Sequence, residues 1–583
     1  MPSAPSHIRA SECSVLVTSR PSPRREMEGI LQELKVIAKA RDHQVGSMTC
    51  YAVNRGLCRQ RLGTYGLETV LKGQDNPGAY FDVWSTLFDK YGFVKEELVD
   101  HDYHKGTGCW GRELDKGTFI YVLDVQVPIK YRRAGIGSLM IRKLLESDRV
   151  KAGDFLVACE MPVQDPSANT MAANETARLR QIDFLRHNHF RRIGRTFFFA
   201  CCSDKSHPSR NVRPADEPES DVIAYEEQEE MNADNILFAQ GLSDAGAMSR
   251  EAHKNPIHNA VGLSPDMRYY YTAPGMGIPV DVFIRQCHTK NPTSVRKRNQ
   301  RGLTPLHAAA INSNLLAVKT LLELGATDDL TKMDNAMGKT PYELVKFVMD
   351  VERETVERTG KKWDGFSQKS LEVAWTLRRA AGEDVGPLEE YVAQYKWGCT
   401  CGKCALGWFS LRMRYRMMRE AAMLSGFMTD STPSYRPGRV TAEDLVNAIG
   451  LDYIPPRLRR DITEAFWLSY RGIVVAILDI CCCGGDIVPQ PLVALRAANT
   501  TGNPRPYIEH GAKADYAVDF VLNNAKTASL LGDGDFDTMM EESETDANVR
   551  RAWDTLPRCE NDLEFDSVRR QLKLSDTMGP YFN

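Results

Sequence analysis

The chain has 583 residues, long enough for about three or four domains with separate cores. Its 74 basic and 77 acidic residues leave a net charge of only −3, so no overall field draws it to nucleic acid or to an anionic membrane. A hydrophobic share of 42% excludes a chain that is disordered throughout.

The first 25 residues are rich in serine and arginine and contain one acidic residue, Glu12. We expect a disordered tail over residues 1–25, with a mitochondrial transit peptide as the minor alternative. No secretory signal peptide opens the sequence, and its 15 cysteines then indicate a reducing environment, cytoplasmic or nuclear. Residues 26–40 carry Ile30, Leu31, Leu34 and Ile37 at helical spacing, which predicts a first helix.

Residues 118–145 combine three patterns without a break. Residues 118–127 are dense in β-branched and aromatic side chains, which predicts a strand that ends at Pro128. A basic, glycine-containing turn follows. Apolar side chains then recur at helical spacing up to Leu145, with Ser138 near the helix start. The expected order is strand, glycine loop and helix.

A glycine loop at a helix N-terminus can bind a phosphate, because unpaired N–H groups and the helix dipole face it. The loop is not a P-loop, because no Gly-Lys-Ser/Thr follows, and not a Rossmann fingerprint, because the third glycine is missing. The alternative to a phosphate-binding loop is an ordinary turn with solvent-exposed basic side chains.

The segments after the glycine loop indicate which kind of phosphate-binding loop it resembles. A strand is expected at residues 154–161, a helix at 175–187 and a strand at 195–202. In this order they resemble the core of the GNAT superfamily of N-acetyltransferases, whose signature Arg/Gln-x-x-Gly-x-Gly/Ala is matched by Arg132, Gly135 and Gly137. Residues 184–190 resemble the family's closing F-Y-x-x-x-G-F turn, with Leu185 in place of tyrosine and His189 in place of glycine.

The resemblance implies an α+β domain over residues 26–203, with a mixed sheet and flanking helices, that uses acetyl-CoA as co-substrate. The loop N–H groups would bind its pyrophosphate, and the edge of the central strand would pair with its pantetheine arm. The implied contacts are Val125, Gln126, Val127, Arg132, Arg133, Ala134, Gly135, Ile136, Gly137 and Ser138, with Asn174 and Asn188 as secondary candidates.

Two carboxylates could serve as the catalytic base. Asp124 lies on the central strand and Glu160 at the end of the next, but alternation cannot decide which face either occupies without the register. Leu185 replaces the tyrosine that in this family usually protonates the leaving thiolate. The resemblance as a whole predicts an acetyl transfer to an amine. The competing hypothesis is an interaction scaffold whose acetyltransferase-like domain is inactive.

Residues 204–259 are rich in Ser, Pro, Asp and Glu, which predicts an acidic flexible linker. The next block, residues 260–350, resembles a short ankyrin-repeat unit: T-P-L-H-x-A runs from Thr304 to Ala309, L-L-x-x-G-A closes at Ala326, and Gly338 opens a degenerate repeat. Residues 278–288 supply a preceding helix. Ankyrin repeats bind proteins, so a protein partner is expected here; packing against adjacent domains is the alternative.

Residues 351–583 predict a mainly helical C-terminal domain, with amphipathic segments at 369–381, 412–423, 462–481 and 514–523. The segments 396–404 and 556–565 are similar to those of multidomain ankyrin proteins from filamentous fungi, a resemblance that implies no activity.

Cys399, Cys401 and Cys404 are close enough to share a zinc ion, but a structural site needs four ligands. A fourth is not visible nearby and would have to come from elsewhere, such as residues 481–483. Zinc is therefore not expected, and packed thiols are the preferred interpretation.

Overall fold

The computed structural model divides the chain into two compact units, one of residues 1–312 and 316–344 and the other of residues 313–315 and 345–583. Each unit is described by itself. The described residues are 8–72, 83–160, 171–220, 254–262, 278–299, 301–335, 337–402, 404, 409–431, 447–460, 462–482, 505–531, 551, 553, 555–575 and 579–581.

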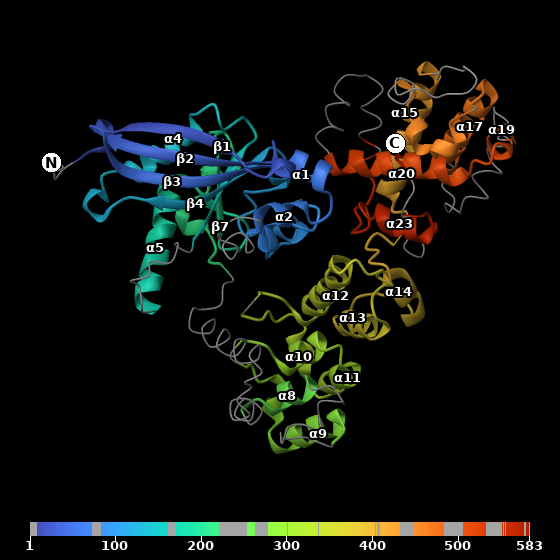
Figure 1. Cartoon of the computed structure of the whole chain (residues 1–583). Coiled ribbons are helices and arrows are strands. Elements are labelled where there is room, and N and C mark those ends of the chain that lie inside the picture. Colours follow the sequence, from blue (N-terminus) through green and yellow to red (C-terminus); the bar gives the residue numbers. More distant parts are fainter. Residues whose placement is uncertain are drawn as a thin grey trace. The chain divides into compact units, whose positions relative to one another are not determined.

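Seven strands of the first unit form one mixed sheet in the order β1-β2-β3-β4-β5-β7-β6 (Figure 1). They are β1 (Ser14–Pro21), β2 (Leu31–Ala40), β3 (His43–Asn54), β4 (Thr118–Gln126), β5 (Phe155–Cys159), β6 (Arg191–Arg192) and β7 (Phe198–Cys202). Strands β4 and β5 run parallel, and the other neighbouring pairs are antiparallel. The predicted α+β class with a mixed sheet is therefore confirmed for this part of the chain.

Helices α1 (Arg55–Leu62), α2 (Gly66–Lys72), α4 (Ile136–Leu145) and α5 (Met171–His187) accompany the sheet, and short 3₁₀ turns connect the elements. The 3₁₀ turns are η1 (Ala10–Glu12), η2 (Arg25–Met27), η3 (Glu96–Leu98), η4 (Arg112–Asp115), η5 (Ile129–Tyr131), η6 (Pro208–Asn211) and η7 (Pro214–Asp216).

The first 40 residues differ from the prediction. Residues 31–40 form strand β2 rather than a helix, and residues 14–21, expected in a tail, form strand β1 beside it. The apolar positions of β2 fit both periods, but Leu34, Val36, Ala38 and Ala40 alternate into the core, and pairing on both sides decides for the strand. Residues 1–7 lie outside the described part.

Both faces of the sheet are buried. Phe119 and Tyr121 of β4 belong to the core on one face, and Ile120 and Val122 to the core on the other. Helices α1 and α2 contribute to the first core, and helices α4 and α5 to the second. A strand buried on both faces needs a continuous apolar run, which explains the composition of β4.

The segment predicted as linker is partly packed. The carboxylate of Glu217 accepts hydrogen bonds from Arg186 Nε at 2.6 Å and from the Arg192 N–H at 3.0 Å. The hydroxyl of Ser220 donates to Glu160 at 2.9 Å. Ordered structure thus continues to residue 220, past the boundary expected at 203, and the acidic run at 226–230 lies outside the described residues.

The ankyrin block contains helix pairs, as expected. Its elements are α8 (Pro256–Gly262), α9 (Val280–Lys290), η9 (Pro292–Arg296), α10 (Pro305–Ile311), α11 (Leu315–Glu323), η10 (Ala326–Asp329) and α12 (Pro341–Arg358). Thr304 caps α10 in a capping box with His307. His307 Nδ1 accepts from the Thr304 N–H at 3.1 Å and its Nε2 lies 3.0 Å from the Lys332 carbonyl, so one neutral tautomer satisfies both bonds. In the degenerate repeat Glu343 replaces the histidine and still caps Thr340.

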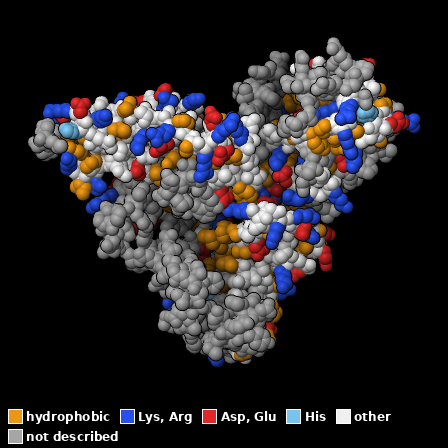
Figure 2. All heavy atoms as spheres, viewed as in Figure 1, with side chains coloured by type: hydrophobic (Ala, Val, Ile, Leu, Met, Phe, Trp, Pro, Cys, Tyr) orange, Lys and Arg blue, Asp and Glu red, His pale blue; other side chains and the backbone are white. Residues whose placement is uncertain are grey.

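The second unit is helical. Its elements are α13 (Gln368–Ala380), α14 (Leu388–Tyr395), α15 (Leu411–Asp430), η12 (Leu451–Tyr453), η13 (Pro456–Leu458), α17 (Glu464–Cys482), α19 (Arg505–Glu509), α20 (Ala514–Leu531) and α23 (Phe565–Gln571). All four helices predicted from amphipathic patterns are confirmed. Figure 2 shows Lys and Arg beside Asp and Glu over the face in view, as the small net charge of −3 leads one to expect.

Helix α17 is long and apolar enough to cross a membrane, the one described helix of which this holds, and 61% of its apolar window is buried. Its Trp467 donates a hydrogen bond to the Met428 carbonyl at 3.1 Å, and Tyr470 donates to the Gly450 carbonyl at 3.1 Å. Burial against α15, α19 and α20 is the environment of a core helix.

Candidate functional site

The loop between β4 and α4 has two residues in the left-handed region. Gly135 lies immediately before α4 with φ of 77°, and Arg133 has φ of 64°. No side chain caps the helix, and Ser138 lies within the first turn. Glycine suits the position before the helix because a β-carbon is disfavoured at this φ.

Six consecutive backbone N–H groups of this loop, from Arg133 to Ser138, find no acceptor among the described residues. The first helical bond runs from the Leu139 N–H to the Gly135 carbonyl at 2.9 Å. Arg132 Nε donates to the Val127 carbonyl at 3.0 Å, which ties the loop to the strand end. The row of donors and the positive end of the α4 dipole coincide, as an anion site requires.

The pairing of the two parallel strands stops short of this loop. Residues 119–122 of β4 pair with residues 155–158 of β5, and β4 then continues to Gln126 with β3 as its described partner. The N–H of Glu160, just after β5, bonds instead to the Phe197 carbonyl at 2.9 Å. Among the described residues, residues 123–126 of β4 therefore have no β5 partner, and this end of β4 leads into the loop before α4.

A β-bulge decides where Asp124 lies. The register with β3 shifts between Thr49, opposite Asp124, and Cys50, opposite Val122, so Leu123 is the extra residue. Val125, rather than Asp124, therefore packs against the α4-side core. The Asp124 carboxylate is half-buried, accepts the Thr49 N–H at 3.1 Å on Oδ1 and the side-chain amide of Gln126 at 2.9 Å on Oδ2.

The other predicted base, Glu160, is fully buried in an ion-pair network. Arg192 Nη1 donates to its Oε2 at 2.5 Å, and Arg178 Nη1 donates to its Oε1 at 2.9 Å. The hydroxyl of Ser220 is a third donor. A buried carboxylate whose oxygens already accept from two guanidinium groups and a hydroxyl is poorly placed to meet a substrate.

The closing turn, residues 184–190, follows helix α5. Leu185 is 2% exposed and belongs to the α4-side core, so no polar group takes the place of the tyrosine. His189 has φ of 65°, the conformation for which glycine is usual at this position. The side-chain amide of Asn188 donates to the Phe184 carbonyl at 2.8 Å and ends the helix. Asn174 lies in the first turn of α5, and its side chain is outside the described part.

Gly137 brings the loop and the closing turn together. A β-carbon there would lie 2.9 Å from Cε2 of Phe184 and 3.7 Å from Cγ1 of Val125. The second glycine of the motif is thus required for close packing of α4 on the ring, not for a left-handed φ. Ile136 is buried beside it, Ala134 is half-buried, and Gln126 is exposed.

The structure brings a fourth cysteine to the three that are close in sequence. Sulfur-to-sulfur distances are 3.9 Å from Cys399 to Cys401, 3.6 Å from Cys401 to Cys404 and 3.4 Å from Cys404 to Cys559. Cys559 is 155 residues from Cys404 and was not recognised as a ligand in the sequence. The one feature of the sequence that connects Cys559 with the other three cysteines is that segments 396–404 and 556–565 both resemble segments of the multidomain ankyrin proteins named above. Cys481 and Cys482 lie on α17, and Cys483 is outside the described residues.

A second group of metal-ligating types lies in the first unit. His101 Nε2 is 3.0 Å and His104 Nε2 is 3.9 Å from the Glu343 carboxylate. Burial lowers the pKa of His104. The Glu343 carboxylate also accepts the Thr340 N–H. A contact between two histidines and a carboxylate explains this arrangement at least as well as a metal site does.

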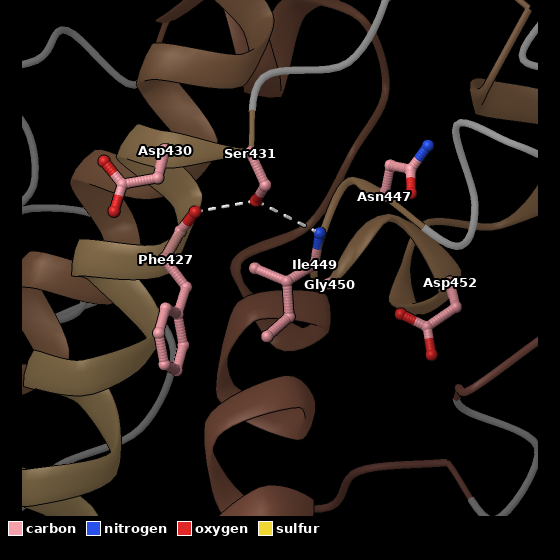
Figure 3. Close-up of a pocket in the computed structure, with 7 residues that line it drawn as sticks. All are labelled: Phe427, Asp430, Ser431, Asn447, Ile449, Gly450 and Asp452. Atoms are coloured by element: carbon pink, nitrogen blue, oxygen red, sulfur yellow. Dashed lines mark hydrogen bonds between the residues drawn. The ribbon is translucent and has the colours of Figure 1, made fainter.

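A pocket of about 580 Å³ opens in the second unit, and none of the predicted site residues is among those that line it (Figure 3). Ser431 bridges its two walls, donating to the Phe427 carbonyl at 2.6 Å and accepting from the Ile449 N–H at 3.4 Å. Burial raises the pKa of Asp452 on its rim. Asp430 is the other acidic residue of the lining. The described residues that line the pocket include no basic side chain, so the pocket does not suit a phosphate ligand.

The family model of the ankyrin repeat matches residues 301–335. No curated protein and no solved structure matches the chain. The matched residues include Thr304, His307 and Gly325, the positions that cap α10 and follow α11. Ankyrin repeats bind other proteins, so this part of the chain has the capacity for protein interaction.

Proposed function

We propose that residues 8–220 form a GNAT-like N-acetyltransferase domain that transfers an acetyl group from acetyl-CoA to an amine, while the ankyrin block binds a protein partner. One observation carries the proposal. Residues 123–126 at the end of β4 have no β5 partner among the described residues, and the loop that follows has a row of N–H groups, from Arg133 to Ser138, that also lack acceptors there. A strand edge and an anion cradle side by side suit a ligand with a peptide-like arm and a pyrophosphate.

The loop is suited to the pyrophosphate for three reasons. Its N–H groups lie at the positive end of the α4 dipole, and the left-handed residues Arg133 and Gly135 turn successive N–H groups toward one side. The side chains of Arg132 and Arg133 are exposed and add positive charge. Gly135 leaves the backbone open to close approach, because the space around its absent β-carbon holds only the Ala10 methyl at 3.5 Å.

The end of β4 that has no β5 partner among the described residues is suited to the pantetheine arm. That arm contains two amide groups, which can pair with residues 123–126 as an added strand. A backbone N–H of this edge would also polarise the thioester carbonyl as negative charge develops on its oxygen.

Of the two predicted bases, Asp124 suits proton transfer better than Glu160, because Asp124 is half-exposed and Glu160 is enclosed by Arg178 and Arg192. The amine nitrogen would lose a proton to Asp124, directly or through water, and attack the thioester carbonyl. A C–N bond forms, the C–S bond breaks, and the departing thiolate takes its proton from water, because Leu185 has none to give.

The second candidate is a scaffold without catalysis. The buried Leu185 and the ankyrin match favour it, since neither is needed for acetyl transfer. The domain would then hold its sheet and loop as packing elements only. The two candidates differ in whether acetyl-CoA binds.

Calorimetric titration of the full-length protein with acetyl-CoA tests the proposal. We expect saturable heat, and we expect Gly135→Asp to weaken binding at least tenfold, about 1.4 kcal/mol, by placing a carboxylate in the anion cradle. Gly153→Asp is the matched control: Gly153 also has a positive φ, 87°, with open space around it, but it precedes the N-terminal end of β5, whereas the loop follows the C-terminal end of the parallel strand β4. No heat, or equal loss in both variants, refutes the assignment.

Transfer itself is measured by mass spectrometry of extracts incubated with the protein and isotopically labelled acetyl-CoA. Asp124→Asn should reduce labelling at least tenfold while binding persists, because the asparagine Oδ1 can still accept the Thr49 N–H. Binding without labelled product for any acceptor would favour the scaffold.

We infer a cytoplasmic or nuclear location from the cysteine content. The cysteines of the described part form no disulfide with one another, which is consistent with a reducing compartment.

A further inference from the structure

The four-cysteine cluster, Cys399, Cys401, Cys404 and Cys559, has the geometry of a metal site. All four sulfurs lie within 4.8 Å of one another, and three of the separations are between 3.4 and 3.9 Å. Four thiolates at about 2.3 Å from a tetrahedral zinc are about 3.8 Å apart along each edge of the tetrahedron. We propose that the second unit binds one structural zinc ion through these four cysteines.

The ligand set favours a single zinc ion. Thiolate sulfur selects zinc or iron–sulfur clusters over the harder divalent cations. A multi-iron cluster needs room for several metal ions and inorganic sulfides between its cysteines, and sulfurs this close to one another leave room for one ion. Four protein ligands also leave no open coordination position, so the ion is structural rather than catalytic.

The backbone around the cluster is arranged for metal binding. Gly398 and Gly402 have φ of 76° and 69°, and these two left-handed turns bend the chain so that three cysteines within six residues face one point. A β-carbon at Gly398 would lie 3.2 Å from Arg353 Nη1, so the first turn is also closely packed.

Hydrogen bonds hold the distant ligand in place independently of the sulfurs. The Cys559 N–H donates to Asp562 Oδ2 at 3.0 Å, and the Ser410 hydroxyl donates to Asp562 Oδ1 at 2.5 Å. The Glu560 N–H donates to the Thr400 hydroxyl at 3.1 Å, which joins the two ligand segments directly. Such second-layer contacts orient metal ligands.

The ion would link two segments of the second unit that are far apart in sequence. Cys399 and Cys404 are 0% and 2% exposed and Cys559 is 8% exposed, so solvent reaches the site mainly at Cys401. The link joins the chain after α14 to the chain before α23, across the 155 residues that include α15, α17 and α20. Closing so long a loop restricts the unfolded chain strongly.

Elemental analysis and native mass spectrometry of the untagged full-length protein test the proposal. We expect one zinc per chain in the wild type and less than one tenth of that in Cys559→Ser and Cys404→Ser. The matched control is Cys482→Ser, which removes an exposed thiol of α17. His104→Ala is the second control, because it disrupts the histidine–carboxylate group and should leave the zinc content unchanged.

X-ray absorption of the wild-type protein keeps the proposal testable if the cysteine variants do not fold. Four sulfur neighbours at about 2.3 Å from zinc support it. Iron in place of zinc, nitrogen or oxygen neighbours, zinc that persists in Cys559→Ser, or zinc that is lost in His104→Ala would each overturn it. None of these outcomes depends on acetyl-CoA binding.

Discussion

Replacing Glu160 by glutamine tests whether this carboxylate stabilises the sheet through its buried ion pairs. The side chain is 0% exposed and accepts from Arg178, Arg192 and Ser220. Glutamine keeps the length and one carbonyl acceptor but turns an amide NH₂ group toward a guanidinium. Arg192, itself 2% exposed, would then be buried without a counter-charge.

The expected cost follows from burial. Removing one partner of a buried ion pair typically destabilises by about 3–5 kcal/mol, because the remaining charge stays desolvated. Glu175→Gln is the matched control: Glu175 pairs with the same Arg178 at 2.8 Å, but its side chain is 49% exposed. We expect a loss below about 1 kcal/mol there.

Native-state hydrogen exchange of the full-length protein measures both losses at the amides of β5 and β7, the strands that flank Glu160. A local readout is needed because two units unfold in one chain and a global transition would mix them. If Glu160→Gln and Glu175→Gln lower the opening free energy equally, the buried network does not stabilise the sheet as argued.

Two further predictions concern pH and backbone conformation. Burial raises the pKa of Asp89 to about 7, above its usual 3.8, against the two backbone N–H bonds that it accepts. The folded state therefore binds this proton more tightly than the unfolded chain, and the stability of the first unit should fall as pH rises from about 4 through 7. Asp89→Asn should remove that part of the pH dependence when native-state hydrogen exchange gives the opening free energy at amides of the first unit at pH 5 and 8; a difference between wild type and variant that is the same at both pH values contradicts it. His189→Gly should stabilise by about 0.5–1 kcal/mol, because it relieves a left-handed φ of 65° at some cost in unfolded-state entropy. Hydrogen exchange at the end of α5 reads this out, and a loss of stability refutes it.

Local sequence patterns were sufficient to predict the secondary-structure elements in which the apolar residues follow one period. The strand at residues 118–127, the glycine loop and the helix after it, the capped α10 and the four C-terminal helices are found where the sequence predicts them. Each depends on contacts within a few residues: β-branched runs, a capping box at Thr304, a left-handed Gly325. The ankyrin repeat belongs to the same class, since its motif lies within 35 residues, 301–335.

Residues 26–40 and Asp124 required pairing partners that sequence spacing does not specify. In residues 31–40 the apolar positions satisfy a helix and a strand alike, and hydrogen bonds to β1 and β3 decide. The face of Asp124 depends on a one-residue bulge opposite Thr49 and Cys50, because a single extra residue exchanges the two faces of a strand.

The sequence by itself determined the elements in which one apolar period dominates, the glycine loop before α4 and three of the four clustered cysteines, because those depend on neighbours along the chain. Only the tertiary structure decided that Glu160 is enclosed by Arg178 and Arg192, that the described pairing of β4 with β5 ends at Val122, and that Cys559 joins cysteines more than 150 residues away. These features arise between segments distant in sequence, and their chemistry depends on burial and charge that only packing creates.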